Sequence, residues 1–432
     1  MNAAGESDWH SARLLLSSLR RVRDWFRSRH LMTWLIALFV GGFIVATTTR
    51  GHRDFLYFLV LLPFFLTLRL SDLRSVFSER VVQVALFFLV CLLISQAWGS
   101  MTDPELVYDR VRWALLAFLF VVVVALMASR DPNWPDKLAC VLAVCVIAAF
   151  IYSVFSFYSQ YDFPASRLAN QLYYSNNPIR GSVGVALAGV VCAFQLMKGS
   201  AGRLGTLFWT GLLSAVSFLI LGQSRGLALA LFVSIVVGLI LGRWWKLLGV
   251  FTLIAVLVVL ATEVPDVGVR GFLGRADSYR LDIWLVTIER IKDVLLFGEG
   301  LNSSREISVS MYDKTFHSPH NIFLVTGVTG GLVGIALLLL LYAVTIRAAI
   351  TVGVRANQWL PLGLIVFGVV TMSLAAHEVI YRVEPHVWLG LWLPIGLASG
   401  AYLGCILPGK IGRGQHLGFS SGRGVQTVDW RE

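Results

Sequence analysis

The chain has 432 residues, of which 57% are hydrophobic and only 14% are charged, and its formal net charge is +11. Soluble domains carry roughly 25% charged residues, so a soluble fold could not bury this much apolar surface, and the composition predicts a membrane protein. The basic residues are spread over short connections rather than gathered on one face with aromatic residues, which argues against a nucleic acid partner. The five cysteines lie inside apolar runs and lack the spacing of a zinc or redox motif.

About twelve runs of the chain approach the roughly 20 mostly apolar residues that a membrane-spanning helix needs. They fall near positions 32–49, 54–69, 81–98, 111–129, 137–158, 182–198, 204–222, 226–242, 245–262, 321–346, 358–377 and 387–407. The sequence therefore predicts an all-α polytopic membrane protein with about twelve transmembrane helices.

The lysines and arginines of the short connections fall mainly on one side of the predicted membrane, and this bias sets orientation. It places both termini in the cytoplasm. Residues 1–31 carry leucines at helical spacing with arginines opposite, which predicts a basic amphipathic cytoplasmic segment. We expect transmembrane helices one to nine within 32–262, one long outer loop at 263–320, and helices ten to twelve within 321–407. A glycine-rich, disordered cytoplasmic tail is expected at 408–432.

The outer loop 263–320 is the most informative segment, because a long ordered loop in a compact protein is usually functional. Apolar residues recur at helical spacing from Ser278 to Leu295, which predicts an amphipathic helix of four or five turns. Gly298-Glu299-Gly300 follows, and glycine commonly ends a helix. The loop is therefore expected to be a helical, catalytic unit before the tenth span.

Two arginines and a tryptophan are candidates for binding an anion on the outer side. Arg225 lies in a glycine-flanked break between two apolar runs, where a guanidinium could grip phosphate oxygens or simply snorkel to the membrane surface. Arg280 and Trp284 are one helical turn apart and share a face. They could serve an anionic ligand, or Trp284 could be a core residue of an amphipathic helix.

Two histidines precede the tenth predicted span, in the sequence His317-Ser318-Pro319-His320-Asn321. A histidine at the outer mouth of a membrane helix can accept a proton near neutral pH, although a surface histidine is the simpler interpretation, and the sequence does not choose between the two. No paired aspartates, nucleotide-binding loop or metalloprotease motif is present. The arginines and histidines fit a site without metal or cofactor that holds a pyrophosphate and takes a proton from an alcohol.

Four short motifs occur in order along residues 222–335. They are Ser224-Arg225-Gly226, Arg280-x-x-x-Trp284, Phe297-Gly298-x-Gly300, and His320-Asn321 followed by Gly327-x-x-Gly330-Gly331-x-x-Gly334. Together with about twelve spans and a large outer loop before the tenth, this set resembles the O-antigen ligase and polymerase superfamily. Arg167-Leu168 and Asn177-Pro178 loosely resemble a further motif, with Ala169 where glycine is common.

The resemblance implies a fold of the GT-C-like class of lipid-dependent glycosyltransferases, in the inner membrane of a Gram-negative bacterium. Members take a glycan from undecaprenyl pyrophosphate at the periplasmic face. Ligases pass it to lipid A–core oligosaccharide, polymerases to another repeat unit, and related oligosaccharyltransferases to protein. The partners implied here are undecaprenyl pyrophosphate-linked O-antigen, lipid A–core oligosaccharide and membrane lipids.

The same resemblance suggests a role for each candidate residue. Arg225 and Arg280, with Arg180 or Arg167, would bind the donor pyrophosphate in place of a metal. His320 would be the catalytic base in an inverting transfer. The remaining residues of the expected substrate-binding set are Trp284, His317 and Asn321.

Four functions remain open from the sequence: an O-antigen ligase, an O-antigen polymerase, a lipid-linked oligosaccharyltransferase and a permease. A single dominant outer loop favours a ligase over a polymerase, since polymerases often have two arginine-rich outer loops and residues 159–181 form only a short second one. A permease for a polysaccharide or small solute would carry charge at mid-membrane depth, whereas here the polar groups collect at the outer face.

Overall fold

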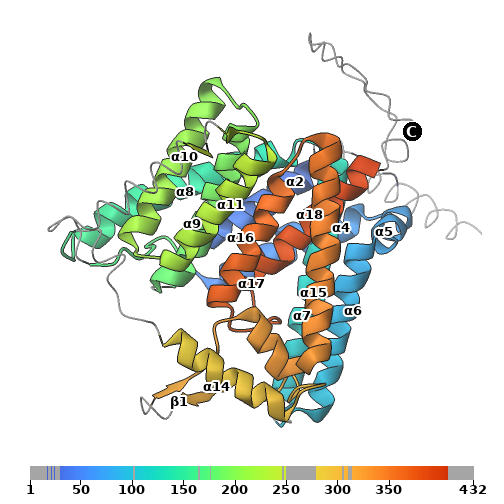
Figure 1. Cartoon of the computed structure of the whole chain (residues 1–432). Coiled ribbons are helices and arrows are strands. Elements are labelled where there is room, and N and C mark those ends of the chain that lie inside the picture. The colour runs from blue at the N-terminus through green and yellow to red at the C-terminus, as the bar shows by residue number, and fades with distance from the viewer. Residues whose placement is uncertain are drawn as a thin grey trace, which may run out of the picture.

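A computed structural model describes residues 17, 21, 24, 30–100, 103–163, 166–175, 177–245, 248–249, 279–303, 306–309 and 314–406. These residues form a bundle of helices with a smaller helical unit across one end (Figure 1). Most of the N-terminal segment 1–31, most of the ninth predicted span 245–262 and the tail 408–432 lie outside the described residues.

The described elements follow one another along the chain as short and long helices, with one pair of strands. They are α2 (Leu31–Val45), α3 (Thr49–Phe55), η1 (Leu56–Leu61), α4 (Leu62–Thr67), α5 (Leu70–Phe77), α6 (Arg80–Ile94), η2 (Ser95–Trp98), α7 (Pro104–Arg130), α8 (Trp134–Tyr158), α9 (Pro178–Met197), α10 (Gly202–Leu221), α11 (Arg225–Leu241), α14 (Arg280–Asp293), β1 (Ile307–Val309), β2 (Lys314–Phe316), α15 (Ile322–Ala356), α16 (Leu360–Ala375), α17 (Pro385–Val387), η4 (Trp388–Trp392) and α18 (Leu393–Ile406).

Many of these helices have the length and apolarity of membrane spans. Among the described residues, seven qualify, and the bent pair Thr49–Thr67 and Leu70–Phe77 raises the number to eight if it counts as one span. The helices α2, α11 and α16 are apolar but shorter. The protein is therefore an all-α polytopic membrane protein, as the sequence predicts. The count of about twelve spans stays a prediction.

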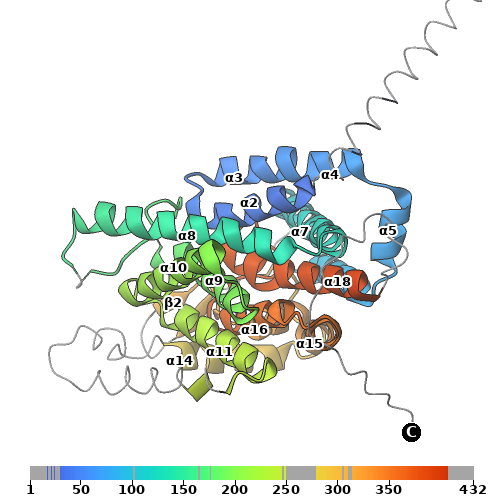
Figure 2. The same ribbon diagram turned by 90° about the horizontal axis from the view of Figure 1, so that it is seen from above.

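The bundle core is formed by helices that are distant in the sequence. The last helix, α18, packs along α7 and α15, while α11 packs along α16 and α9 along α10. Figure 2 shows this core with α8 and α2 lying across it. Large apolar side chains on the outside, such as Phe58, Phe155 and Val354, are more than half exposed, as side chains that face lipid would be.

The outer loop forms a small unit with a hydrophobic cluster of its own. Helix α14 lies across one end of the bundle beside the β1–β2 hairpin (Figure 1), whose strands are antiparallel with Ile307 opposite Phe316. Ile283 of α14 is buried against Ile307 and Val309, with Trp284 and Phe316 packed around them. This cluster fixes the face that α14 turns toward the rest of the protein.

Helix α15 is broken at Gly331, and the segment after α14 completes it. Gly331 has φ +60° and ψ −154°, which breaks the helical hydrogen bonding. Across the break, the amides of Glu299 and Gly300 donate to the carbonyls of Val328 and Thr329 at 2.7 and 3.0 Å. Backbone groups in a spanning helix need such partners, because lipid offers none.

The glycines of this segment have a different role from the one the sequence suggested. Helix α14 ends at Asp293, before the glycines, whereas Gly298 and Gly300 adopt positive φ angles of +66° and +93°. A Cβ on Gly298 would lie 2.6 Å from the amide nitrogen of Gly331. These glycines therefore allow the loop to approach the broken helix closely, rather than capping α14.

Substituting Gly331 by alanine is expected to destabilise the protein and loosen the outer loop. The new Cβ would lie 2.4 Å from the Leu296 backbone, at a φ of +60° that alanine rarely adopts. Gly330→Ala is the matched control, since its nearest contact is the Leu92 Cδ2 at 3.5 Å. Thermal unfolding in detergent should give a lower Tm for Gly331→Ala alone. Equal Tm values for the two variants would contradict this account.

Candidate functional site

One end of the bundle gathers the starts of several spanning helices and most of the polar residues singled out by the sequence. Helices α9, α11 and α15 begin there, and the last span begins there at α17. Each helix start carries a partial positive charge and unpaired amide groups, so a convergence of starts favours an anion.

His320 lies directly before α15, and several contacts fix its position. Its φ of +55° turns the chain sharply, and its amide donates to the Ser318 hydroxyl at 3.2 Å. The next residue, Asn321, caps α15 by accepting from the Phe323 and Leu324 amides at 2.9 and 3.3 Å. This cap and the turn set the direction of the imidazole.

Helix α14 is tied to the same turn. The Trp284 indole donates a hydrogen bond of 2.9 Å to the carbonyl of Pro319, the residue before His320. Arg280 lies one turn earlier on α14, on the same face as Trp284. The tryptophan therefore holds the start of α14 beside His320.

Burial and two arginines lower the pKa of His320 and so favour its uncharged form. The pKa of His320 lies below its ordinary value because the ring is largely buried and because the positive charges of Arg280 and Arg180 act on it. The three side chains thus share one electrostatic environment although they come from α14, α9 and the start of α15. A neutral imidazole at pH 7 can accept a proton.

Two further histidines continue from His320 toward the bundle core. The rings of His320 and His377 meet edge to face with centroids 4.3 Å apart, and His386 follows with its centroid 6.1 Å from His377. Both ring nitrogens of His386 are buried without a hydrogen-bond partner among the described residues. The Ser318 hydroxyl donates to the carbonyl of His377 at 3.4 Å and links the two loops.

Two carboxylates, the buried Glu384 and the partly buried Glu378, pair with arginines at this end. The Arg180 Nε lies 3.0 Å from the Glu384 Oε1, and Arg110 makes a two-pronged contact with Glu378. Burial raises the pKa of Glu384, and the charge of Arg180 opposes that rise. Both pairs join the segment between α16 and α17 to helices far away in sequence.

Arg225 and Arg167 lie around the starts of α11 and α9. Arg225 is the first residue of α11, and the hydroxyl of the preceding Ser224 lies 3.4 Å from that of Ser182, two residues beyond Arg180 on α9. The Arg167 Nε donates to the Gly222 carbonyl at 3.3 Å. Arg225, Arg167 and Arg180 therefore belong to neighbouring turns.

The structure separates the two histidines that the sequence left equivalent. The His317 side chain is 89% exposed and lies 4.0 Å from the Glu306 carboxylate, whereas His320 is half-buried beside His377. The oxygen of Asn321 and the indole of Trp284 are both used in positioning contacts.

Sequence reasoning did not identify His377, His386 or Glu384. All three lie in the polar interruption between α16 and α18, where Pro385 starts the last span. A charged residue next to a proline at the mouth of a span was the available signal. Glu378 and its partner Arg110 are 268 positions apart, so spacing could not reveal this pair.

The arrangement combines an anion site with a proton acceptor. Guanidinium groups match phosphate oxygens geometrically, and the neutral imidazole of His320 can take a proton. Among the described residues, no group of three or more His, Cys, Asp or Glu side chains is placed to hold a metal ion. The arginines at this end could stabilise the charge of such an anion.

Comparison with known proteins supports one family. Residues 210–339 match the family model described as O-Antigen ligase, a segment that contains Arg225, Arg280, Trp284 and His320. No curated protein matches the chain. The family implies an enzyme of glycosyltransferase type that acts on polysaccharide and lipid-linked substrates. Through this segment, the chain is similar to the O-antigen ligase family.

Proposed function

We propose that this protein is an O-antigen ligase, which transfers O-antigen polysaccharide from undecaprenyl pyrophosphate to lipid A–core oligosaccharide. The reaction would take place at the periplasmic face of a Gram-negative inner membrane, with both termini in the cytoplasm. The observation that carries the proposal is the position of His320, partly buried at the end where spanning helices begin, where the charges of Arg280 and Arg180 help to lower its pKa.

In the proposed reaction, the pyrophosphate of the donor is bound by Arg225, Arg280 and Arg180, with Arg167 at the edge. An acceptor sugar hydroxyl gives its proton to His320 as its oxygen bonds to the anomeric carbon. The bond from that carbon to the pyrophosphate oxygen breaks on the opposite face, and undecaprenyl pyrophosphate leaves with the electron pair. The anomeric configuration inverts.

In this scheme, the positive charge of the arginines stabilises the leaving group. Negative charge builds up on the pyrophosphate as the bond breaks. Cations that are already fixed in position stabilise this charge and so lower the barrier. The pairing of Arg180 with buried Glu384 holds that guanidinium in place. The hydrogen bonds of Trp284 and Asn321 hold the turn that contains His320 against α14 and at the start of α15.

His320 is proposed as the base, rather than His317, because of its surroundings. A general base must lie within hydrogen-bond reach of the proton it takes and must be uncharged at the working pH. The low pKa of His320 meets the second condition. His317 is exposed on the rim, away from the second histidine ring.

The phenotype of a deletion strain distinguishes a ligase from a polymerase. Loss of a ligase should leave long glycan on the lipid carrier and bare core lipid, because chains are still assembled but not passed on. Loss of a polymerase would instead give core capped with a single repeat unit. If glycan accumulated neither on the lipid carrier nor on the core lipid, and glycan-modified protein disappeared, the protein would instead be an oligosaccharyltransferase. Gel analysis of lipopolysaccharide and of the lipid-linked pool separates these outcomes.

The pH dependence of transfer should follow the low pKa of His320. Because the neutral ring is the active form, kcat/KM for the donor should stay high as the pH falls and drop only below about 6.5, the ordinary histidine pKa. Arg280→Gln removes a charge that lowers the pKa of His320. The acidic limb of the profile should then move to higher pH.

The control for this shift is Arg382→Gln, an exposed arginine on the same end of the bundle whose guanidinium lies over the Tyr381 ring. Its profile should match that of the unmodified protein. An acidic limb that does not move in Arg280→Gln would show that another group titrates.

A further inference from the structure

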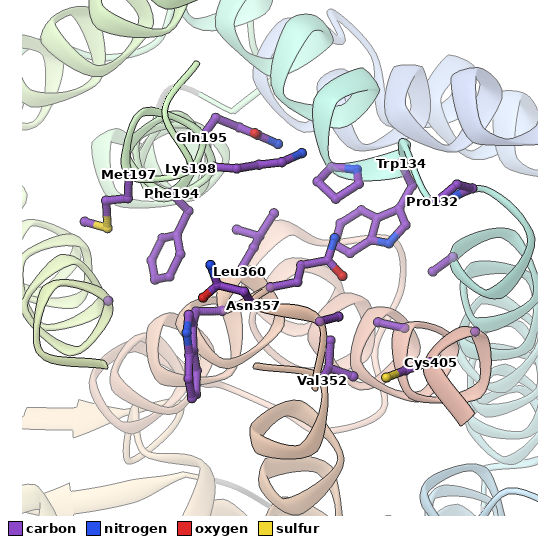
Figure 3. Close-up of a pocket in the computed structure, with 18 of the residues that line it drawn as sticks. Pro132, Trp134, Phe194, Gln195, Met197, Lys198, Val352, Asn357, Leu360 and Cys405 are labelled. Atoms are coloured by element: carbon purple, nitrogen blue, oxygen red, sulfur yellow. The ribbon is translucent and has the colours of Figure 1, made fainter. Parts of the chain in front are cut away.

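A second cavity lies at the end of the bundle opposite to the candidate site. It has a volume of about 690 Å³ and is lined by the ends of α7, α9, α11, α15 and α18 and by the starts of α8 and α16. Figure 3 shows its walls, with Gln195 and Lys198 of α9 directed toward Trp134 of α8. Binding pockets for small molecules and lipids typically measure a few hundred to a thousand Å³.

One residue that lines this cavity has a buried amide oxygen without a partner among the described residues. Gln195 is only 2% exposed, and its side-chain oxygen is buried with no hydrogen-bond partner among the described residues. Leaving such an acceptor unsatisfied is costly, so a ligand that brings an N–H or O–H donor to Gln195 would be stabilised there. Gln195 is therefore the observation that points to a ligand.

Cationic side chains also line the cavity. Arg130 and Lys198 contribute their charges, and no aspartate or glutamate lines it within the described ranges. Their ion-pair partners, Asp72 at 2.5 Å and Asp136 at 3.1 Å, lie outside the lining. Such cations can attract a phosphate.

The C-terminal ends of the helices favour a positively charged group, in contrast to the arginine and lysine, which favour a negatively charged one. Five helices present their C-terminal carbonyl groups at this end, and these carry partial negative charge that favours a cation or a hydrogen-bond donor. The cavity thus offers separate places for a phosphate and for a donor such as an ammonium group. A zwitterionic ligand matches both.

Aromatic and apolar walls point to a lipid rather than a soluble metabolite. Trp134, Trp244 and Trp359 line the cavity, and tryptophan is enriched where a membrane meets water. Phe194, which packs against Gly238 and Gly363, and Met197 provide apolar surface beside them. These walls suit a position at the depth of lipid headgroups, with apolar surface beside it for acyl chains.

We propose that this cavity binds a phospholipid of the leaflet opposite to the candidate site, with a headgroup that carries a phosphate and a primary amine. The phosphate would lie near Arg130 and Lys198, and the amine would donate to Gln195 and to the helix-end carbonyls. The acyl chains would run along Phe194 and Met197.

Native mass spectrometry of the full-length protein with defined lipids tests the proposal. Phosphatidylethanolamine has the donor, while phosphatidylcholine has the same phosphate and charge but no N–H. The protein should retain phosphatidylethanolamine about tenfold more strongly, the effect of one hydrogen bond to a charged group. Gln195→Leu should abolish this preference. The variant should fold, because it replaces an unsatisfied polar group by an apolar one of similar shape.

Controls separate the lipid from other occupants. Arg280→Ala, at the other end of the bundle, should keep the preference. Equal retention of the two lipids, or an unchanged preference in Gln195→Leu, would overturn the proposal. So would competition by glycerophosphoethanolamine at the affinity of the whole lipid, which would indicate a soluble ligand. Retention of no lipid at all, as when another part of the chain fills the cavity, would overturn it as well.

Discussion

Replacing His320 by alanine is expected to lower the rate of glycan transfer about 10²–10⁴-fold while leaving donor binding nearly unchanged. The imidazole takes the acceptor proton in the proposed step, and the neighbouring His377, whose ring centroid lies 4.3 Å away, is not assigned that role. The His320 ring contacts the His377 ring and is acted on by the charge of Arg280, so its loss removes the proton acceptor without removing a cation. Single-turnover transfer and separate donor-binding measurements distinguish the two effects.

His317→Ala is the matched control for this result. It removes an imidazole three residues away, on the exposed rim, and should transfer glycan at close to the unmodified rate. If His320→Ala retained near-normal transfer and His317→Ala lost it, the assignment of the base would be reversed. His320→Ala should also unfold at the same temperature as the parent protein, so that lost activity reflects chemistry.

Donor affinity should fall about 10- to 100-fold when Arg225 or Arg280 is replaced by alanine. Each guanidinium is proposed to make charge-assisted hydrogen bonds to the pyrophosphate, and one such bond contributes about 1.5–3 kcal/mol. Lysine at the same positions should recover only part of the affinity, because an ammonium group cannot make the two-pronged contact. Binding of the lipid-linked glycan can be measured in detergent by competition.

Arg382→Ala provides the matched control for the arginine variants. It removes an exposed guanidinium from the same end of the bundle and lowers the local positive charge equally, so any general electrostatic effect should appear in it. Unchanged donor affinity in both Arg225→Ala and Arg280→Ala would place the pyrophosphate elsewhere.

The membrane-spanning architecture could be predicted from the sequence because its cause is local. A run of apolar residues long enough to cross the bilayer must form a helix to satisfy its own backbone, and the run predicted at 137–158 became α8 at Trp134–Tyr158. The break of α15 at Gly331 could not be predicted, since the hydrogen bonds that repair it come from residues 295–300, in another segment.

The candidate site was predicted in part, for a similar reason. Arg280, Trp284 and His320 stand in short motifs within the segment that matches the O-antigen ligase family model, so a local pattern was enough to single them out. Glu384 could not be assigned in this way, because it is explained only by Arg180, which lies 204 positions earlier and meets it through the packing of α9 against α17. A side chain whose partner is distant in the sequence forms no short motif, so a sequence pattern cannot reveal it.

The most direct test of the account is transfer by the purified full-length protein in detergent, with lipid-linked glycan and lipid A–core oligosaccharide as substrates. With no ATP and with a chelator present, the account predicts glycan joined to core lipid and release of undecaprenyl pyrophosphate, both lost in His320→Ala. Absence of transfer by a folded protein that binds both substrates, or equal transfer by His320→Ala, would contradict it.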